Sequence, residues 1–470
     1  SKKNLASARL GGGLRPIEDD ELLDEVTALV ERPNVLVCEF EKEFLEVPSE
    51  CLILTMKANQ KYFPLLDASG RLTHRFLVVS NITPDDPSAV IGGNERVVRP
   101  RLADAKFFFD QDRRQSLESR LPSLEKVVYH NKLGSQGERV RRVETIAGWV
   151  AESIGADAGL ARRAALLSKA DLVTDMVGEF PELQGVMGGY YARHSGENDQ
   201  VAQAIADQYI LNRGEVADPT NLVSAALVLA DRAETLVGIW GIGLKPTGDK
   251  DPFALRRHAL TVIRMFELLG EAASHSGRSF ELDLEQLLSR AASTFGSILA
   301  TDTVAQVMTF VYERYANQLA GLYGLLPVAA VMDQRPPLQQ VTSRVQAVVE
   351  FQKLPEAPAL AAANKRIGNI LKKSTGADAH VNVQLLQEPA EQALHAAMQR
   401  VLPVADARVE AGDYTGSLSA LAELREPVDA FFDGVMVNAE QTDLRLNRLG
   451  LLSVLHRATN RVALLERLAA

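Results

Sequence analysis

Gly93-Asn-Glu-Arg-Val-Val-Arg-Pro-Arg-Leu-Ala-Asp-Ala-Lys-Phe-Phe-Phe109 is the stretch at which the spacing of apolar residues changes in this chain of 470 residues. From Glu95 onward the apolar residues recur with a helical period almost to the end of the chain. Prolines such as Pro122 and Pro181 separate one helix from the next. The sequence therefore predicts a mainly α fold for everything that follows this stretch.

The residues before this stretch follow a different pattern. Residues 18–31 carry apolar side chains at helical spacing, which predicts an amphipathic helix. Short apolar runs bounded by turn residues predict strands. These runs are residues 35–38, residues 52–56, and a hairpin of residues 62–66 and 76–80 around the turn 67–70. We expect them to form a small mixed α/β module.

Length and prolines indicate how the chain is divided. A chain of 470 residues is too long for one core and should form two to four domains. Pro336-Pro337 and the prolines at 355–358 flank the clearest later boundary. We predict four parts: a mixed α/β module at 1–95, a helical connector at 96–134, a helical domain at 135–335 and an all-helical domain at 336–470.

Composition limits the classes of protein to consider. The net charge of −10 is not typical of a nucleic-acid binder, so any RNA contact must come from local basic patches. The two cysteines, Cys38 and Cys51, form neither a disulfide framework nor a zinc ligand set, which predicts a reducing cytoplasm. No apolar run approaches the length of a membrane span, and no signal peptide opens the chain. Because the first residue is Ser1, we expect the sequence to begin inside a longer protein.

Several catalytic motifs are missing from the sequence. It contains no phosphate-binding loop, no His-Glu-x-x-His, no Cys-x-x-Cys and no Gly-x-Ser-x-Gly. The glycines between 238 and 248 lack the Rossmann spacing and follow a helical pattern. The ATP-site signatures of the two classes of aminoacyl-tRNA synthetase are also not recognisable. We therefore expect no adenylation site and no catalytic residue in this chain.

Basic residues gather in two clusters near the C-terminus. Residues 364–376 contain Lys365, Arg366, Lys372 and Lys373 and no acid, a local charge of +4. Residues 444–470 carry the same local charge, and their arginines include Arg445, Arg448, Arg457 and Arg461. Arginine binds phosphates and base edges with its planar fork and stacks on unpaired bases. The alternative is that these residues lie on solvated helix faces, some of them paired with Asp429, Asp433 or Asp443.

Four stretches, in order, carry a resemblance to one family. They are Met56-Lys-Ala-Asn-Gln-Lys-Tyr-Phe-Pro-Leu65 with Phe76-Leu-Val-Val-Ser-Asn-Ile82, the stretch 93–109 quoted above, Lys169-Ala-Asp-Leu-Val-Thr-Asp-Met-Val-Gly-Glu-Phe-Pro-Glu-Leu-Gln-Gly185 with Asp251-Pro-Phe-Ala-Leu-Arg-Arg257, and Pro427-Val-Asp-Ala-Phe-Phe-Asp-Gly-Val-Met-Val-Asn438 with Leu444-Arg-Leu-Asn-Arg-Leu449. Together they resemble the beta subunit of bacterial α2β2 glycyl-tRNA synthetase without its N-terminal part.

The resemblance implies a cytoplasmic ligase that joins glycine to its tRNA with ATP. The alpha subunit of the family carries the adenylation site, with ATP and Mg2+, and the beta subunit handles the tRNA. The expected partners are thus the alpha subunit and glycine tRNA, with no membrane, no DNA and no cofactor bound by this chain. Because residues 336–470 resemble an all-helical anticodon-binding domain, we assign anticodon-loop recognition to the two basic clusters. Phe431, Phe432 and the leucines at 449, 451, 452 and 455 are expected in the core.

Residues 135–335 look like the HD-type helical domain of the family. An active HD phosphohydrolase holds its metal with a His, a His-Asp pair and a later Asp. None of the eight histidines precedes an Asp, and Ser168-Lys169 stands where the pair would fall. Asp231 matches only the last ligand, so we expect a degenerate pocket of Ser168, Lys169 and Asp231 without a metal. Lys169 then meets a phosphate of the tRNA acceptor end, or it forms a structural ion pair with Asp171 or Asp231.

A row of carboxylates, one histidine and one helix start in this domain also allow predictions. Asp171, Asp175 and Glu179 recur every four residues, which predicts one helix face that is solvated or binds a cation. His194 is expected in a loop, as a surface or capping histidine rather than a general base. Asp251 is expected to cap a helix that starts at Pro252, which puts Arg256 and Arg257 in its second turn, available to phosphates or acids.

Two other functions remain open at this point. One is an HD-type metal-dependent phosphohydrolase, against which the absent His-Asp pair argues. The other is a scaffold for the alpha subunit without RNA contacts in this chain, which predicts alpha binding without tRNA binding.

Overall fold

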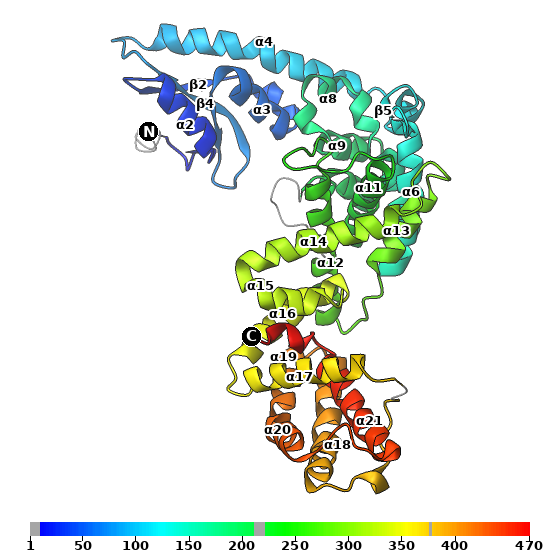
Figure 1. The fold of residues 1–470 in the computed structure, drawn as a ribbon. Coiled ribbons are helices and arrows are strands. Elements are labelled where there is room, and N and C mark those ends of the chain that lie inside the picture. Colours follow the sequence, from blue (N-terminus) through cyan, green and yellow to red (C-terminus); the bar gives the residue numbers. More distant parts are fainter. Residues whose placement is uncertain (1–9, 211–220, 376–377) are drawn as a thin grey trace. The chain divides into compact units, whose positions relative to one another are not determined.

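The computed structural model describes residues 10–210, 221–375 and 378–470. The chain divides into two compact units, Ser1–Ala230 and Asp231–Ala470, with the boundary inside one helix, α11 (Leu222–Gly241). Most of the described residues are helical, and the strands lie in the first unit. The predicted mainly α fold with a small N-terminal α/β module is confirmed (Figure 1).

The N-terminal module is an antiparallel sheet with the strand order β1-β3-β4-β2. Its strands are β1 (Arg15–Pro16), β2 (Asn34–Glu39), β3 (Phe63–Leu66) and β4 (Leu72–Ser80). The helix α2 (Asp20–Leu29) packs Leu22, Leu23 and Val26 against Phe63, Leu65 and Leu77 of the sheet. The predicted amphipathic helix and the β3–β4 hairpin are therefore confirmed.

One predicted strand is wrong. Residues 52–56 lie inside the helix α3 (Ser49–Gln60). Cys51, Leu52, Thr55 and Met56 are buried, and this spacing of three and four places them on one side of a helix. Pro48 precedes the helix, and Lys61 ends it in the left-handed conformation (φ 57°). The apolar run alone was too short to distinguish a strand from a helix.

The stretch 93–109 lies in one long helix, α4 (Ser88–Asp112). Its buried face consists of Val98, Leu102, Ala105, Phe109 and Asp112. Pro100 lies on the exposed side, and the helix continues through it. Within the first unit, α4 runs beside the sheet module and on to α8 (Figure 1). The predicted boundary at residue 95 therefore falls inside a helix.

Shorter elements complete the first unit. They are η2 (Glu118–Arg120), α5 (Leu121–Leu124), β5 (Val128–His130), β6 (Gly134–Ser135), α6 (Gln136–Ile154), α7 (Ala158–Leu167), η3 (Ala170–Val173), α8 (Asp175–Glu179), η4 (Pro181–Leu183), α9 (Val186–His194) and α10 (Asp199–Asp207). Ser135 and Glu138 form a reciprocal capping box at the start of α6.

The second unit is helical throughout its described part apart from an isolated bridge between Thr247 and Lys250. After α11 come α12 (Leu255–His275), α13 (Leu284–Ser293), α14 (Thr303–Tyr323), α15 (Leu325–Met332) and α16 (Leu338–Gln352). The last group is α17 (Ala357–Lys372), η6 (Val383–Leu385), α18 (Pro389–Glu410), α19 (Tyr414–Leu421), η7 (Ala422–Leu424), α20 (Arg425–Gly434), α21 (Thr442–Thr459) and η8 (Leu465–Leu468).

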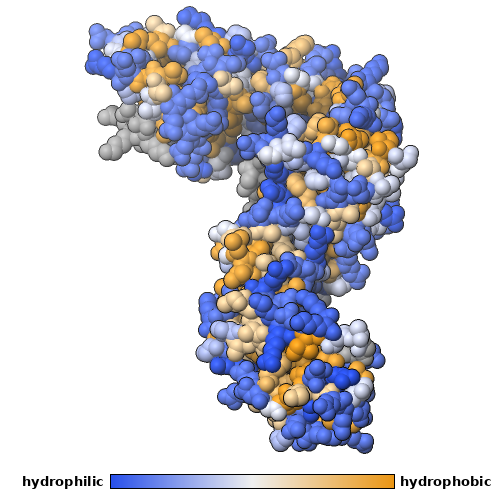
Figure 2. Space-filling view, viewed as in Figure 1, coloured by the Kyte–Doolittle hydropathy of each residue, from blue (hydrophilic) through white to orange (hydrophobic). Residues whose placement is uncertain are grey.

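The second unit exposes one group of leucines. Leu322, Leu325 and Leu326 are 72%, 78% and 53% exposed at the corner between α14 and α15, where Figure 2 shows hydrophobic surface. On the same face of the molecule, hydrophilic and hydrophobic residues are mixed on the surface of the C-terminal helices (Figure 2). None of the helices described combines the length and the apolar character that crossing a membrane requires.

Candidate nucleic-acid interface

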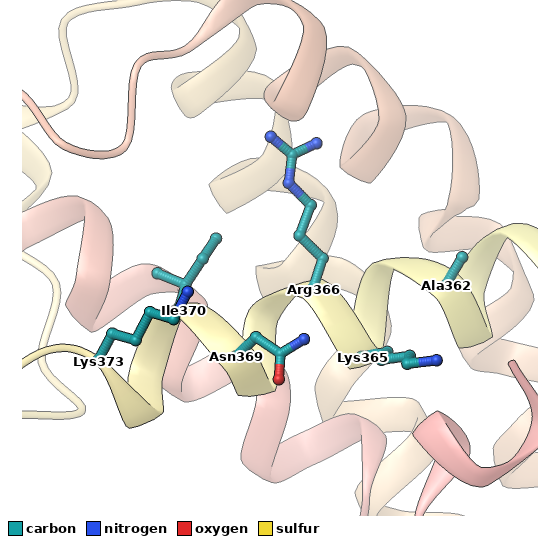
Figure 3. Close-up of a pocket in the computed structure, with 6 residues that line it drawn as sticks. All are labelled: Ala362, Lys365, Arg366, Asn369, Ile370 and Lys373. Atoms are coloured by element: carbon teal, nitrogen blue, oxygen red, sulfur yellow. The ribbon is translucent and has the colours of Figure 1, made fainter.

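The first basic cluster lies on α17, which has one buried and one exposed face. Leu360, Ala361, Asn364, Ile367 and Gly368 are buried against α21, α20 and η8. The opposite side of the helix carries Lys365, Arg366 and Lys373, all exposed. With Ala362, Asn369 and Ile370 they line a groove of about 310 Å3. Figure 3 shows these six residues following one another along α17.

Arg366 is held by an aromatic ring of a neighbouring helix. Its guanidinium carbon lies over the Phe432 ring of α20, 4.3 Å from the ring centroid. Phe432 is half-buried, whereas its neighbour Phe431 is completely buried, and their rings meet edge to face at 5.4 Å. The predicted core position is confirmed for Phe431 and for the four leucines of α21, but Phe432 is only half-buried and its ring supports a cation.

Lys372 lies apart from the groove, on another side of α17. It is exposed, and its charge lowers the pKa of His456 on α21, although burial of the imidazole is the larger cause of that lowered pKa. The first basic cluster is therefore divided, with Lys365, Arg366 and Lys373 on the groove and Lys372 towards α21.

The second basic cluster is divided further. Arg448 is buried on α21, where its Nη2 lies 2.8 Å from Glu391 Oε1 and its Nη1 donates to the Met436 carbonyl at 2.6 Å. This burial argues against the predicted phosphate contact, and we leave Arg448 out of the interface. Arg445 is half-buried and donates to the Ala439 carbonyl at 3.1 Å.

Arg457 and Arg461 of this cluster also differ. Arg457 is exposed near the end of α21. Arg461 lies beyond that helix and pairs with Asp406 and Glu410 at 3.0 and 2.6 Å. Hydrogen bonds to these two carboxylates raise the pKa of Arg461. Ion pairing was the alternative for this cluster, but the acids are Glu391, Asp406, Glu410 and, for Arg467, Asp333 rather than the three that the sequence suggested.

Lys169 does not lie at the surface. It is 1% exposed, and its ammonium group donates to Gln208 Oε1 at 2.8 Å and to the Tyr209 hydroxyl at 2.5 Å. Ser168, also buried, donates to the Ala165 carbonyl at the end of α7. A buried ammonium group with these partners is not available to the phosphate of a tRNA. We therefore leave Lys169 out of the interface.

Asp231, the third member of the predicted pocket, belongs to the second unit. It is buried and lies 2.5 Å from the guanidinium of its neighbour Arg232. Within residues 10–210, 221–375 and 378–470, no three His, Cys, Asp or Glu side chains gather in a way that could hold a metal ion.

The predicted carboxylate face of Asp171, Asp175 and Glu179 does not form. Asp171 lies in η3, and the extended residue Thr174 separates it from α8, which begins at Asp175. Asp171 is buried, and its Oδ2 accepts the backbone N–H groups of Gly185 and Gly188 at 2.7 and 3.0 Å. Burial raises the pKa of Asp171 to about 6, while these hydrogen bonds and the charge of Lys169 oppose the rise.

This raised pKa predicts a pH-dependent stability. The native state holds the Asp171 proton up to about pH 6, whereas the ordinary value is 3.8. Between these two pKa values the native state binds a proton that the unfolded state releases, so the free energy of unfolding should fall as the pH rises from 4 to 6. The fall should reach about 3 kcal/mol relative to Asp171→Asn, whose side chain does not titrate. Urea midpoints of the two proteins measured across this range test it, and parallel profiles would contradict it.

Two further expectations in the helical domain are corrected. His194 is the last residue of the helix α9 rather than a loop residue. The helix after Asp251 begins at Leu255, not at Pro252, because Ala254 adopts a left-handed conformation (φ 55°). Asp251 still caps it, accepting the N–H groups of Leu255 and Arg256, both at 2.9 Å.

The helix start decides the roles of the two arginines at 256 and 257, which lie in its first turn. Arg256 donates to the Gly248 carbonyl at 2.5 Å, so its guanidinium holds the preceding loop. Arg257 is exposed and remains available to a phosphate.

Comparison with known proteins decides the family. The family described as glycyl-tRNA synthetase beta subunit matches residues 2–332. The chain belongs to this family. The DALR anticodon binding domain matches residues 360–464, which include most of α17, Phe432 and the second basic cluster up to Arg461. The resemblance recognised in the sequence is confirmed.

Curated members of the glycyl-tRNA synthetase beta subunit family are close in sequence. The glycine–tRNA ligase beta subunit of Paracidovorax citrulli is 63% identical over 469 residues, covering 99% of this chain. That of Polaromonas naphthalenivorans is 62% identical over 470 residues, also covering 99%. The chain spans 65% of the length of each of these relatives.

Proposed function

We propose that this chain is the tRNA-binding part of a glycine–tRNA ligase beta subunit, and that its C-terminal helices bind the anticodon loop of glycine tRNA. The observation that carries the proposal is the basic groove of α17, which lies inside the region matched by an anticodon-binding domain. Its exposed cations Lys365, Arg366 and Lys373 provide a local positive surface on a chain of net charge −10. Local charge of this kind is what phosphate binding requires.

The remaining assignments follow from family membership. The alpha subunit is the proposed partner and supplies the adenylation site, where ATP and Mg2+ are used, in the cytoplasm. Of the four-part division we keep the HD-like domain at 135–335 and the anticodon-binding domain at 336–470, whereas the boundary at residue 95 falls inside α4. Arg445, Arg457 and Lys372 are accessible enough to add to the anticodon interface, and Arg257 is the candidate contact for the acceptor end.

The test compares the binding of two RNAs by this chain alone. Fluorescence anisotropy measures the affinity for glycine tRNA and for the same tRNA with an altered anticodon. Loss of one base that the protein recognises should weaken binding by about 1–3 kcal/mol, if the scale known for DNA sites applies. Equal affinities would contradict anticodon recognition and leave only phosphate binding. No binding of either RNA, together with binding of the alpha subunit, would favour the scaffold.

A further inference from the structure

Arg366 differs from Arg448 and Arg461 in what its guanidinium contacts. Arg461 and Arg448 are engaged by carboxylates, whereas within the described part of the chain no carboxylate lies at ion-pair distance from Arg366. Instead, one side of its guanidinium is covered by the Phe432 ring at 4.3 Å. The residue remains exposed, so the guanidinium is oriented by an aromatic support and is open to solvent.

We propose that Arg366, supported by Phe432, is the stacking platform for one unpaired base of the tRNA anticodon loop, and that Lys365 and Lys373 bind the phosphates on either side of that base. The inference rests on the proposed tRNA binding and names the contacts made in the same groove. Unpaired RNA bases stack on guanidinium planes as well as on aromatic rings, and every base offers such a face.

The composition of the groove fits a base flanked by phosphates. Ala362 and Ile370 give it apolar surface, and the exposed amide of Asn369 offers a donor and an acceptor to a base edge. Its volume of about 310 Å3 is at the lower end of the range for small-ligand sites. Lys365 and Lys373 are eight positions apart and therefore about 12 Å apart along the helix, with Arg366 between them.

The experiment separates stacking from charge. Arg366→Lys keeps the positive charge and removes the planar guanidinium. Lys365→Gln with Lys373→Gln removes two charges and keeps the platform. Arg400→Gln, at an exposed position of α18, is the matched control. The whole chain is titrated with the anticodon stem-loop of glycine tRNA, carrying 2-aminopurine at successive loop positions, at several salt concentrations.

We expect Arg366→Lys to weaken binding about tenfold, which is about 1.4 kcal/mol, with an unchanged salt dependence. It should also abolish the quenching of 2-aminopurine at one loop position. The lysine pair should instead lower the slope of log K against log salt by about 0.7 for each lost phosphate contact and retain the quenching. Thermal melting verifies that each variant folds.

Three results would overturn the inference. If Arg366→Lys binds and quenches like the wild type, or if it changes only the salt slope, Arg366 is no stacking platform. If the wild-type chain does not bind the stem-loop at all, the proposed tRNA binding itself fails, and the inference fails with it.

Discussion

Replacing Arg448 with alanine is expected to destabilise the C-terminal helices by about 3–5 kcal/mol, because the change leaves a buried carboxylate without its cation. Glu391 is completely buried and lies 2.8 Å from the Arg448 guanidinium. Arg448 also holds the Met436 carbonyl after α20, so one side chain joins three segments of the fold. Hydrogen exchange of peptides from α18 and α21, together with the thermal midpoint, measures the loss.

Matched variants make this prediction specific. Glu391→Ala should cost a similar amount, and Arg457→Ala, which removes an exposed arginine of the same helix, should change stability by less than about 0.5 kcal/mol. Glu391→Leu combined with Arg448→Met should restore much of the stability, since apolar residues can replace a buried ion pair. Buried Glu391 Oε2 and Arg448 Nε have no hydrogen-bond partner within the described residues, which favours that rescue.

A different result would reinstate the prediction made from the sequence. If Arg448→Ala melts and exchanges like the wild type but binds tRNA more weakly, Arg448 is an RNA contact and the buried pair contributes nothing to the fold.

The arginines of α21 show what a charge pattern can and cannot predict. The sequence shows where basic residues are frequent, but the burial of each side chain depends on the faces that neighbouring helices cover. Arg445 and Arg448 are one turn apart on the same helix, yet Arg448 faces Glu391 of α18, which is 57 positions away. Residues so far apart in sequence leave no periodic signal, so the sequence could not distinguish Arg448 from Arg457.

Lys169 and the groove of α17 also depend on contacts between residues far apart in the sequence. Lys169 was recognised as the residue at the place of the metal-binding pair, but its partners Gln208 and Tyr209 come from a distant segment. On α17, by contrast, Ala362, Arg366, Asn369 and Lys373 recur at spacings of three and four, and this spacing could have predicted a common face. The support of Arg366 by Phe432 joins two helices and required the structure.

Helices and strands formed as predicted where the apolar pattern was long or bounded by turn residues. The helix α2 and the β3–β4 hairpin formed as predicted, since a full amphipathic period and the turn at 67–70 define them. The five-residue run at 52–56 did not, because its apolar content fits either period and the surrounding module selected a helix.

Asp112, at the end of α4, is the other buried carboxylate whose replacement is expected to destabilise the fold strongly. It is 2% exposed, and its oxygens accept the backbone N–H groups of Asp175 and Met176 at 2.8 and 3.0 Å. The hydroxyl of Tyr191 donates to the same carboxylate at 2.6 Å. Burial and then this hydrogen bond raise the pKa of Tyr191, which keeps the phenol a donor. Asp112 therefore caps the start of α8 from another helix and joins it to α9.

Asp112→Ala should leave the N–H groups of Asp175 and Met176 and the Tyr191 phenol without their acceptor, at about 1–3 kcal/mol for each unsatisfied buried group. We expect a total loss of about 3–5 kcal/mol and faster hydrogen exchange in α8 and α9. Asp112→Asn, which keeps one oxygen, should lose less. Asp104→Ala on the exposed side of α4 is the matched control and should change stability by less than about 0.5 kcal/mol. If Asp112→Ala and Asp104→Ala unfold at the same urea concentration and exchange hydrogen alike, the carboxylate of Asp112 does not hold these helices together. Their contact then depends on apolar packing, such as that of the Phe109 ring against the Tyr191 ring, with the two ring centroids 6.0 Å apart.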